Sequence, residues 1–187
     1  MLYNDKKTTM KIIVLIIFFL FCSKLSYEQS VYSFSITTAE GQQHSLQEYG
    51  GKNILILVLP VTQTGNDSLY LKWVDSVAAA HAEDLQVIGV PSYEDGYTNN
   101  MAAALNTFYR QFLNARLLIS SGLNTHKTSV TQHALFAWLT NSSQNIHYDK
   151  DVAGTGQMFF ITGQGTLHGV FGPECKFSNK VLTYMLH

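Results

Sequence analysis

Two apolar runs dominate the hydrophobic pattern of the chain, and each is long enough for one strand of a sheet. Residues 53–60 hold six consecutive branched apolar residues before Pro60, and residues 85–91 form a second run that ends at Pro91. Strands that are buried on both faces have this continuous pattern, as in a parallel sheet covered by helices. Between the runs, apolar residues recur at helical spacing, and this strand–helix–strand order predicts a parallel pair with a right-handed crossover. The expected apolar face of the helix consists of Tyr70, Trp73, Val74, Val77 and Ala78.

The rest of the pattern predicts an α/β sandwich with a central mixed sheet, parallel core strands and a C-terminal antiparallel hairpin. Residues 31–36 partly alternate apolar and polar positions, as a half-buried strand does, and a turn follows over residues 39–41. Residues 157–162 and 166–171 flank Gly163-Gln-Gly165, which is typical of a hairpin. Asn66 or Asp67 is expected to cap the first helix, because such side chains accept free backbone N–H groups. Further helices are predicted over 101–113, 131–140 and 177–186, with a helical turn over 46–51 and a short strand over 117–119. Loops are predicted over 91–100, 120–130 and 141–155.

The N-terminus predicts an export segment. Lys6, Lys7 and Lys11 precede an unbroken apolar run over residues 12–21, which is typical of a secretory signal peptide and short for a membrane span of about 20 residues. We therefore predict that residues 1–26 are a signal peptide or an N-terminal membrane anchor, and that residues 27–187 form the folded domain. Lipidation at Cys22 is an alternative, although the preceding residue is a bulky Phe. The protein is expected to be periplasmic or secreted, with membrane contact only through this segment.

Composition narrows the classes of function. The chain has 187 residues, 46% of them hydrophobic, and a formal net charge of −1, so one domain with a sizeable core is expected and nothing favours nucleic-acid binding. The two cysteines are Cys22 and Cys175, and only Cys175 remains after removal of the N-terminal segment. One cysteine forms neither an intramolecular disulfide nor a CxxC redox pair.

Four segments, in the same order along the chain, carry a resemblance to a known family. They are residues 44–58, entering the central strand; residues 85–91, the second strand; residues 132–139, a helix; and residues 158–165, the start of the hairpin. Together they resemble the glutathione peroxidase-like family over about residues 31–187. The resemblance implies a thioredoxin-like three-layer sandwich and, in that family, thiol peroxidase chemistry that serves the oxidative stress response.

The positions that carry the family's chemistry differ in this chain. The resemblance implies a cysteine or selenocysteine nucleophile at Thr64, a glutamine at Glu94, and a tryptophan–asparagine pair at Gly154 and Thr155. A hydroxyl group at Thr64 is barely ionised at neutral pH, because its pKa lies many units above 7 and each unit corresponds to about 1.36 kcal/mol. The positive end of a helix dipole stabilises a negative charge by only about 1 kcal/mol, which cannot close this gap. Thr64 is expected to be a loop or capping residue, and no catalytic residue is expected at these positions.

Other candidate chemistry is weak. The seven histidines are scattered without a metal-binding motif, and no GxSxG nucleophile elbow is present, so we expect neither a metal nor another cofactor. Cys175 is a candidate thiol for metal binding, oxidation or a mixed disulfide, and the alternative is a cysteine with no catalytic role. Asn66-Asp-Ser68 and Asn141-Ser-Ser143 match glycosylation sequons, which matter only in a eukaryotic secretory route.

Two functional hypotheses follow. In the first, the protein is non-catalytic and binds an unknown protein or small-molecule partner at the former active-site face. That face would consist of Gln63, Thr64, Gly65, Tyr93 and Glu94. In the second, the protein is a thiol-dependent peroxidase or another oxidoreductase that uses Cys175 or a partner's thiol. A purely structural envelope protein, which would bind no ligand, is a third alternative.

Overall fold

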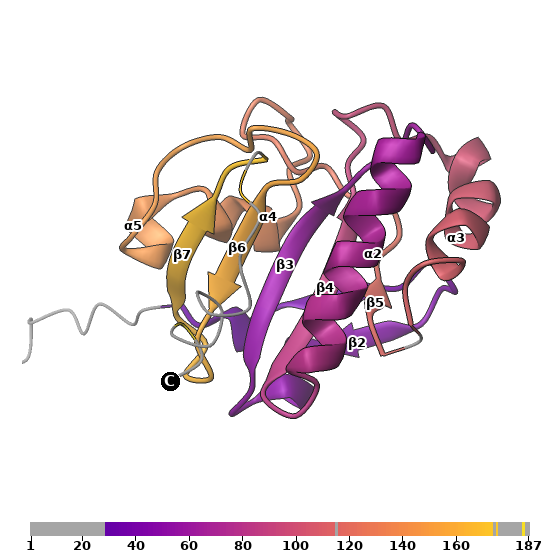
Figure 1. The fold of residues 1–187 in the computed structure, drawn as a ribbon. Coiled ribbons are helices and arrows are strands. Elements are labelled where there is room, and N and C mark those ends of the chain that lie inside the picture. Colours follow the sequence, from indigo (N-terminus) through magenta and orange to yellow (C-terminus); the bar gives the residue numbers. More distant parts are fainter. Residues whose placement is uncertain (1–28, 115, 174, 176–184, 186–187) are drawn as a thin grey trace, which may run out of the picture.

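The computed structural model describes residues 29–114, 116–173, 175 and 185, and these form a sheet with helices on both faces (Figure 1). Its five strands run in the order β5-β4-β3-β6-β7, and β1 and β2 form a separate antiparallel hairpin. The strands are β1 (Ser35–Thr37), β2 (Gln43–Ser45), β3 (Asn53–Leu59), β4 (Leu85–Pro91), β5 (Leu118–Ile119), β6 (Met158–Ile161) and β7 (Leu167–Phe171). The α-helices are α2 (Gly65–Ala80), α3 (Ala102–Arg110), α4 (Ala134–Leu139) and α5 (Ser142–Asn145). Short 3₁₀ turns cover Val31–Ser33, Leu46–Tyr49 and Asn99–Met101.

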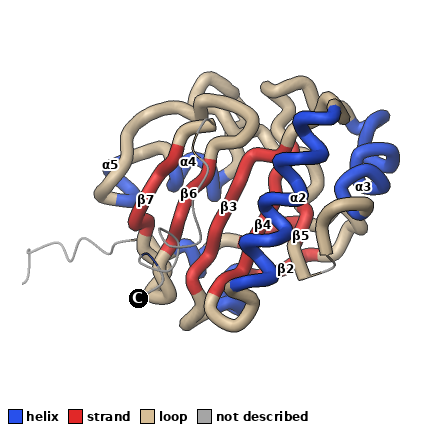
Figure 2. Tube along the Cα trace, in the orientation of Figure 1, coloured by secondary structure: helices blue, strands red, loops and turns tan. Residues whose placement is uncertain are grey.

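The register confirms the predicted mixed sheet. Strands β3, β4 and β5 are parallel to one another, whereas β6 pairs antiparallel with β3 and with β7. Figure 2 shows this sheet as a continuous layer, with α2 and α3 on one face and α4 on the other. The two apolar runs of the sequence are thus neighbouring central strands, with Leu59 paired to Pro91 at their carboxyl ends.

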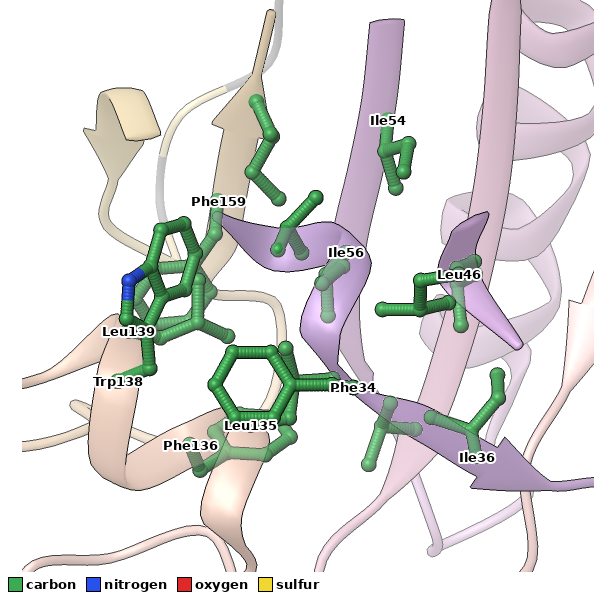
Figure 3. Packing of buried hydrophobic residues seen from close by; sticks show 14 of the residues in the cluster. Phe34, Ile36, Leu46, Ile54, Ile56, Leu135, Phe136, Trp138, Leu139 and Phe159 are labelled. Carbon is green, nitrogen blue, oxygen red and sulfur yellow. The ribbon is translucent and has the colours of Figure 1, made fainter. Parts of the chain in front are cut away.

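Alternate residues of β3 fill two separate hydrophobic cores. Leu55, Leu57 and Leu59 pack with α2 and α3, whereas Ile54 and Ile56 point to the opposite face. There they meet the aromatic side chains of α4 and β6, as Figure 3 shows for Phe136, Trp138 and Phe159. Full burial of one such side chain contributes about 1.5–3 kcal/mol, so β3 stabilises both faces of the sheet.

Several predicted boundaries are wrong for physical reasons. The first strand covers only residues 35–37, because a 3₁₀ turn capped by Ser30 replaces its first half. Helix α4 begins after His133 rather than at residue 131, since the His133 ring accepts the backbone N–H of Leu135 as an N-cap. The connection over residues 141–155 was predicted to be a loop, yet it contains α5, because the Asn141 side chain caps a helical turn.

The apolar face of α2 is also displaced from the prediction. Val74 and Val77 are buried as predicted, but Leu71 completes the buried set, and Tyr70, Trp73 and Ala78 are partly buried at its border. Apart from residue 185, the predicted closing helix over residues 177–186 lies outside the described residues, as does the N-terminal segment 1–26. Within the described part of the chain, none of the helices has the length and apolar character needed to cross a bilayer.

Candidate functional site at the carboxyl edge of the sheet

The loops that follow β3, β4 and β5 meet at one edge of the sheet, because these strands are parallel. The segment before β6 reaches the same edge, where the Val58 carbonyl accepts the N–H of Gly156. In open α/β sheets the carboxyl ends of parallel strands are where ligands bind. The structure thus brings the loops of all four positions implied by the family resemblance to one edge.

Thr64 is the N-cap of α2, as the capping expectation for this residue predicted. Its hydroxyl accepts the N–H of Asp67 at 3.2 Å, and its own N–H donates to the Asp67 carboxylate at 2.8 Å. The Thr62 hydroxyl donates to the same carboxylate oxygen at 2.7 Å. The prediction that Asn66 or Asp67 would be the cap is therefore wrong: the cap lies two residues before Asn66, and Asp67 is the reciprocal partner in a capping box.

The residues on either side of Thr64 are open to solvent. Gln63 has a φ of 56°, a left-handed conformation that is uncommon for a residue other than glycine, and its side chain is exposed. Gly65 is exposed as the first residue of α2, and no atom lies within 4 Å of where a Cβ would stand. Three of the five binding candidates thus form one exposed turn at the start of α2.

Glu94 anchors the loop after β4 to the loop after β5. Its carboxylate accepts the Thr125 N–H at 2.9 Å and the Ser92 hydroxyl at 3.1 Å. The hydroxyl oxygens of Ser92 and Thr125 lie 2.8 Å apart. Ser92 and Thr125 are fully buried. Burial acts to raise the pKa of Glu94, but the N–H and hydroxyl donors and the nearby His126 outweigh it, so this pKa lies below its ordinary value.

Asp95 and His126 form a second link behind Glu94. The Asp95 Oδ1 atom lies 3.7 Å from His126 Nε2, and these side chains are 14% and 22% exposed. The Thr155 hydroxyl donates to Asp95 Oδ2 at 3.4 Å, and Gly154 packs beside the same carboxylate. Burial raises the pKa of Asp95, with a contribution from the Glu94 charge, whereas His126 and Thr155 act in the opposite direction.

Tyr93 is the exposed aromatic residue of this edge. Its side chain is 36% exposed, and its hydroxyl donates to the Asn99 side-chain oxygen at 2.6 Å. The ring meets Tyr97 edge to face, with centroids 5.2 Å apart. Both rings pack over Gly122, where a Cβ would lie only 2.1 Å from the Tyr97 ring.

Cys175 lies elsewhere in the structure. Cys175 is half-buried and packs against the core on the α2 side of the sheet. Among the described residues, no three His, Cys, Asp or Glu side chains lie close enough together to hold a metal ion. His126 is the histidine that belongs to the edge described here.

Sequence reasoning missed four residues of this site. Asp95, Ser92, Thr125 and His126 were not predicted as site residues, although they hold the loops together. Their position in the sequence carried a usable indication, because each lies a few residues beyond a predicted parallel strand. Their pairing could not be predicted, since the two loops are about thirty residues apart.

The architecture defines this chain as a thioredoxin-like fold of the kind found in glutathione peroxidase-like proteins. Its structural neighbours include the apo form of Trgpx, with a TM-score of 0.63 and 15% identity over 84% of this chain and 95% of that chain. T. cruzi GPX1 has a TM-score of 0.61 and 15% identity over 84% of this chain and 94% of that chain. A SCO1/SenC family lipoprotein from Bacillus anthracis is also similar, with a TM-score of 0.54 and 12% identity over 82% of this chain and 90% of that chain. At these identities the likeness establishes the fold.

No protein-family model matches the sequence, and no curated protein is significantly similar to it.

Proposed function

We propose that this protein is an exported, glutathione peroxidase-like protein that lacks peroxidase chemistry and binds a partner at the former active-site face. The observation that carries the proposal is the capping box at the start of α2. The position of the nucleophile holds Thr64, whose hydroxyl and N–H are both bonded to Asp67. The N-terminus of α2 therefore already has an anionic partner from its own first turn.

This capping box disfavours a thiolate at position 64. A peroxidatic cysteine needs a low pKa, which a free, positively polarised helix end helps to provide. Here the Asp67 carboxylate lies at that end and would repel a second negative charge. The other implied positions also differ from the family's glutamine, tryptophan and asparagine. The glutamine position holds Glu94, whose carboxylate is already bonded to Thr125. The tryptophan–asparagine positions hold Gly154 and Thr155, and the Thr155 hydroxyl is bonded to Asp95.

Exposed residues at the same edge support the binding part of the proposal. Gln63, Thr64 and Gly65 form an exposed turn, and Tyr93 presents a ring that is held in place by Asn99 and Tyr97. An aromatic ring fixed in one orientation loses little entropy on binding, and strained backbone as at Gln63 concentrates at functional sites. The unknown partner is a protein or a small molecule. Export would follow from residues 1–26, as signal peptide or membrane anchor.

The first test is peroxide consumption by the purified protein, with hydrogen peroxide and an organic hydroperoxide, in the presence of thioredoxin or glutathione. We expect no turnover above buffer, in the wild type and in Cys175→Ser alike. Turnover that disappears in Cys175→Ser would overturn the proposal and make Cys175 a relocated nucleophile. If neither protein turns over peroxide, pull-downs from the cell envelope with wild type and Tyr93→Ala would search for the partner.

A variant that restores the thiol at position 64 provides a second test. Thr64→Cys restores the thiol at the family position, and we expect it to remain without peroxidase activity, because Asp67 still occupies the end of the helix. The double variant Thr64→Cys, Asp67→Asn removes that charge. Its thiol should react faster with a thiol-directed alkylating reagent at pH 7 than the thiol of Thr64→Cys does. Equal rates would show that Asp67 does not control the charge state at this position.

A further inference from the structure

Three loops at the carboxyl edge are joined by one carboxylate and one imidazole. Asp95 lies in the turn after β4, His126 in the loop after β5, and Thr155 in the segment before β6. The contacts at Asp95 are 3.7 Å to His126 Nε2 and 3.4 Å to the Thr155 hydroxyl. Asp95 is therefore the point at which segments 31 and 60 residues away in the sequence meet.

One nitrogen of the His126 ring lacks a hydrogen-bond partner. Its Nε2 atom is buried and has no hydrogen-bond partner among the described residues, because 3.7 Å to Asp95 exceeds hydrogen-bonding distance. An unsatisfied buried polar atom destabilises the conformation that holds it. A protonated ring carries a donor at Nε2 beside an ionised carboxylate, and a movement of less than 1 Å would complete a charge-assisted bond.

Carboxylates approach His126 from the neighbouring loop. Asp95 and Glu94 both act on it from the loop after β4, and the neighbours of Asp95 in the segment before β6, Thr155 and Gly154, are uncharged. On its own loop, the Lys127 ammonium is engaged by Asp149 at 2.5 Å, and the Lys127 N–H donates to Asp151. Two carboxylates thus face one imidazole, while the neighbouring cation is paired elsewhere.

We propose that Asp95 and His126 form a pH-sensitive latch that closes the three loops when His126 is protonated and Asp95 is ionised. Imidazoles titrate between about pH 5 and 8, so the latch is closed in mildly acidic solution and opens as the pH rises. A protonated ring beside an ionised carboxylate adds a charge-assisted contact to the closed loops, and that contact is lost when the ring gives up its proton at higher pH. Below the carboxyl pKa of Asp95, which burial raises, the latch opens again.

The latch deepens the proposed function, since the loops it joins carry Tyr93 and Glu94 of the proposed binding face. Closure would hold this face in one shape in acid and release it near neutral pH. The latch is measured without any ligand or peroxide, however, so its failure and the failure of the proposed function are separate outcomes.

The test is amide hydrogen exchange of the full-length protein at pH 5.5 and pH 8, corrected for the intrinsic pH dependence of exchange. Peptides over residues 122–127 and 151–156 should exchange about fivefold more slowly at pH 5.5 in the wild type. His168→Gln, at an exposed histidine on β7, should behave like the wild type, whereas His126→Gln and Asp95→Asn should each lose the difference. A pH response that persists in either variant, or none in the wild type, would overturn the latch.

A second measurement covers the case in which Asp95→Asn folds poorly. Ring ¹H–¹³C spectra of the wild type should show His126, identified by its absence in His126→Gln, titrating together with the amide signals of residues 154–156. Titration of the ring without any change at residues 154–156 would show that His126 is not coupled to the third loop, and would overturn the proposal.

Discussion

The loops that follow the neighbouring parallel strands β3 and β4 satisfy their polar groups in different ways. After β3, Thr62 and Thr64 bond to Asp67, which is at most five residues away, and the cluster is exposed. After β4, Glu94 and Asp95 bond to residues 31 and 60 positions away, of which Thr125 is fully buried and Thr155 is half-buried. The first loop is a local device for starting a helix. The second is a tertiary network that depends on the whole sheet being assembled.

The difference determines how many segments of the chain each loop depends on. A capping box depends on a single turn, because all of its partners lie in that turn. The network behind Glu94 requires compatible residues in three segments. We therefore expect substitutions after β3 to have small effects on stability and substitutions after β4 to have large ones, since removing one partner of a buried polar group leaves the other unsatisfied.

Matched glycine substitutions should give the largest contrast. Gly122 lies in the loop after β5 and packs against the loop after β4, and in Gly122→Ala the new Cβ would lie 2.1 Å from the ring of Tyr97 and 3.1 Å from that of Tyr93. Because Tyr97 is buried, we expect a loss of about 2–3 kcal/mol in the free energy of unfolding. Gly65→Ala meets no atom within 4 Å, and it should leave stability unchanged or raise it by about 0.5 kcal/mol. Urea unfolding measures both, and equal losses would contradict the contrast.

Glu94→Ala should come next in size. It leaves the buried N–H of Thr125 without its acceptor, which should cost about 2 kcal/mol in urea unfolding. Glu94→Gln, which places the glutamine implied by the family resemblance, keeps an acceptor oxygen and should lose less than half as much. If both variants lose the same amount, the charge of Glu94 rather than its hydrogen bonds holds the two loops together.

Thr64→Ala tests the other loop. The substitution removes the N-cap acceptor of α2 and should cost about 1 kcal/mol, whereas Thr64→Ser keeps the hydroxyl and should cost a few tenths. The measurement is again urea unfolding, with far-UV circular dichroism to follow helix content. A loss above that of Glu94→Ala would show that the exposed loop is the more important of the two.

The same distinction explains what the sequence could predict. The continuous apolar pattern of residues 53–59 and 85–91 identified the two central strands, because burial on both faces leaves a signature in the residues themselves. Thr64 was expected to be a loop or capping residue on similarly local grounds. Asp95 and His126 gave no such signature, since each is an ordinary polar loop residue until the parallel strands bring the two loops together. The absence of peroxidase activity and the binding role of Gln63, Gly65 and Tyr93 stay predictions.

The smallest predicted effect concerns His133, which titrates with the opposite sign to the latch. Its Nδ1 accepts the Leu135 N–H at the start of α4, and burial lowers its pKa, so the folded state favours the neutral ring. A lowered folded pKa gives a stabilisation that is complete above the unfolded value of about 6.5 and is lost as the pH falls through the folded pKa. His133→Asn provides a cap that does not titrate. From pH 7.5 to pH 5 the wild type should therefore lose up to about 1 kcal/mol relative to His133→Asn in urea unfolding, the full contribution of one N-cap. A wild type that gains stability relative to this variant on acidification would show that the ring does not act as an acceptor for α4.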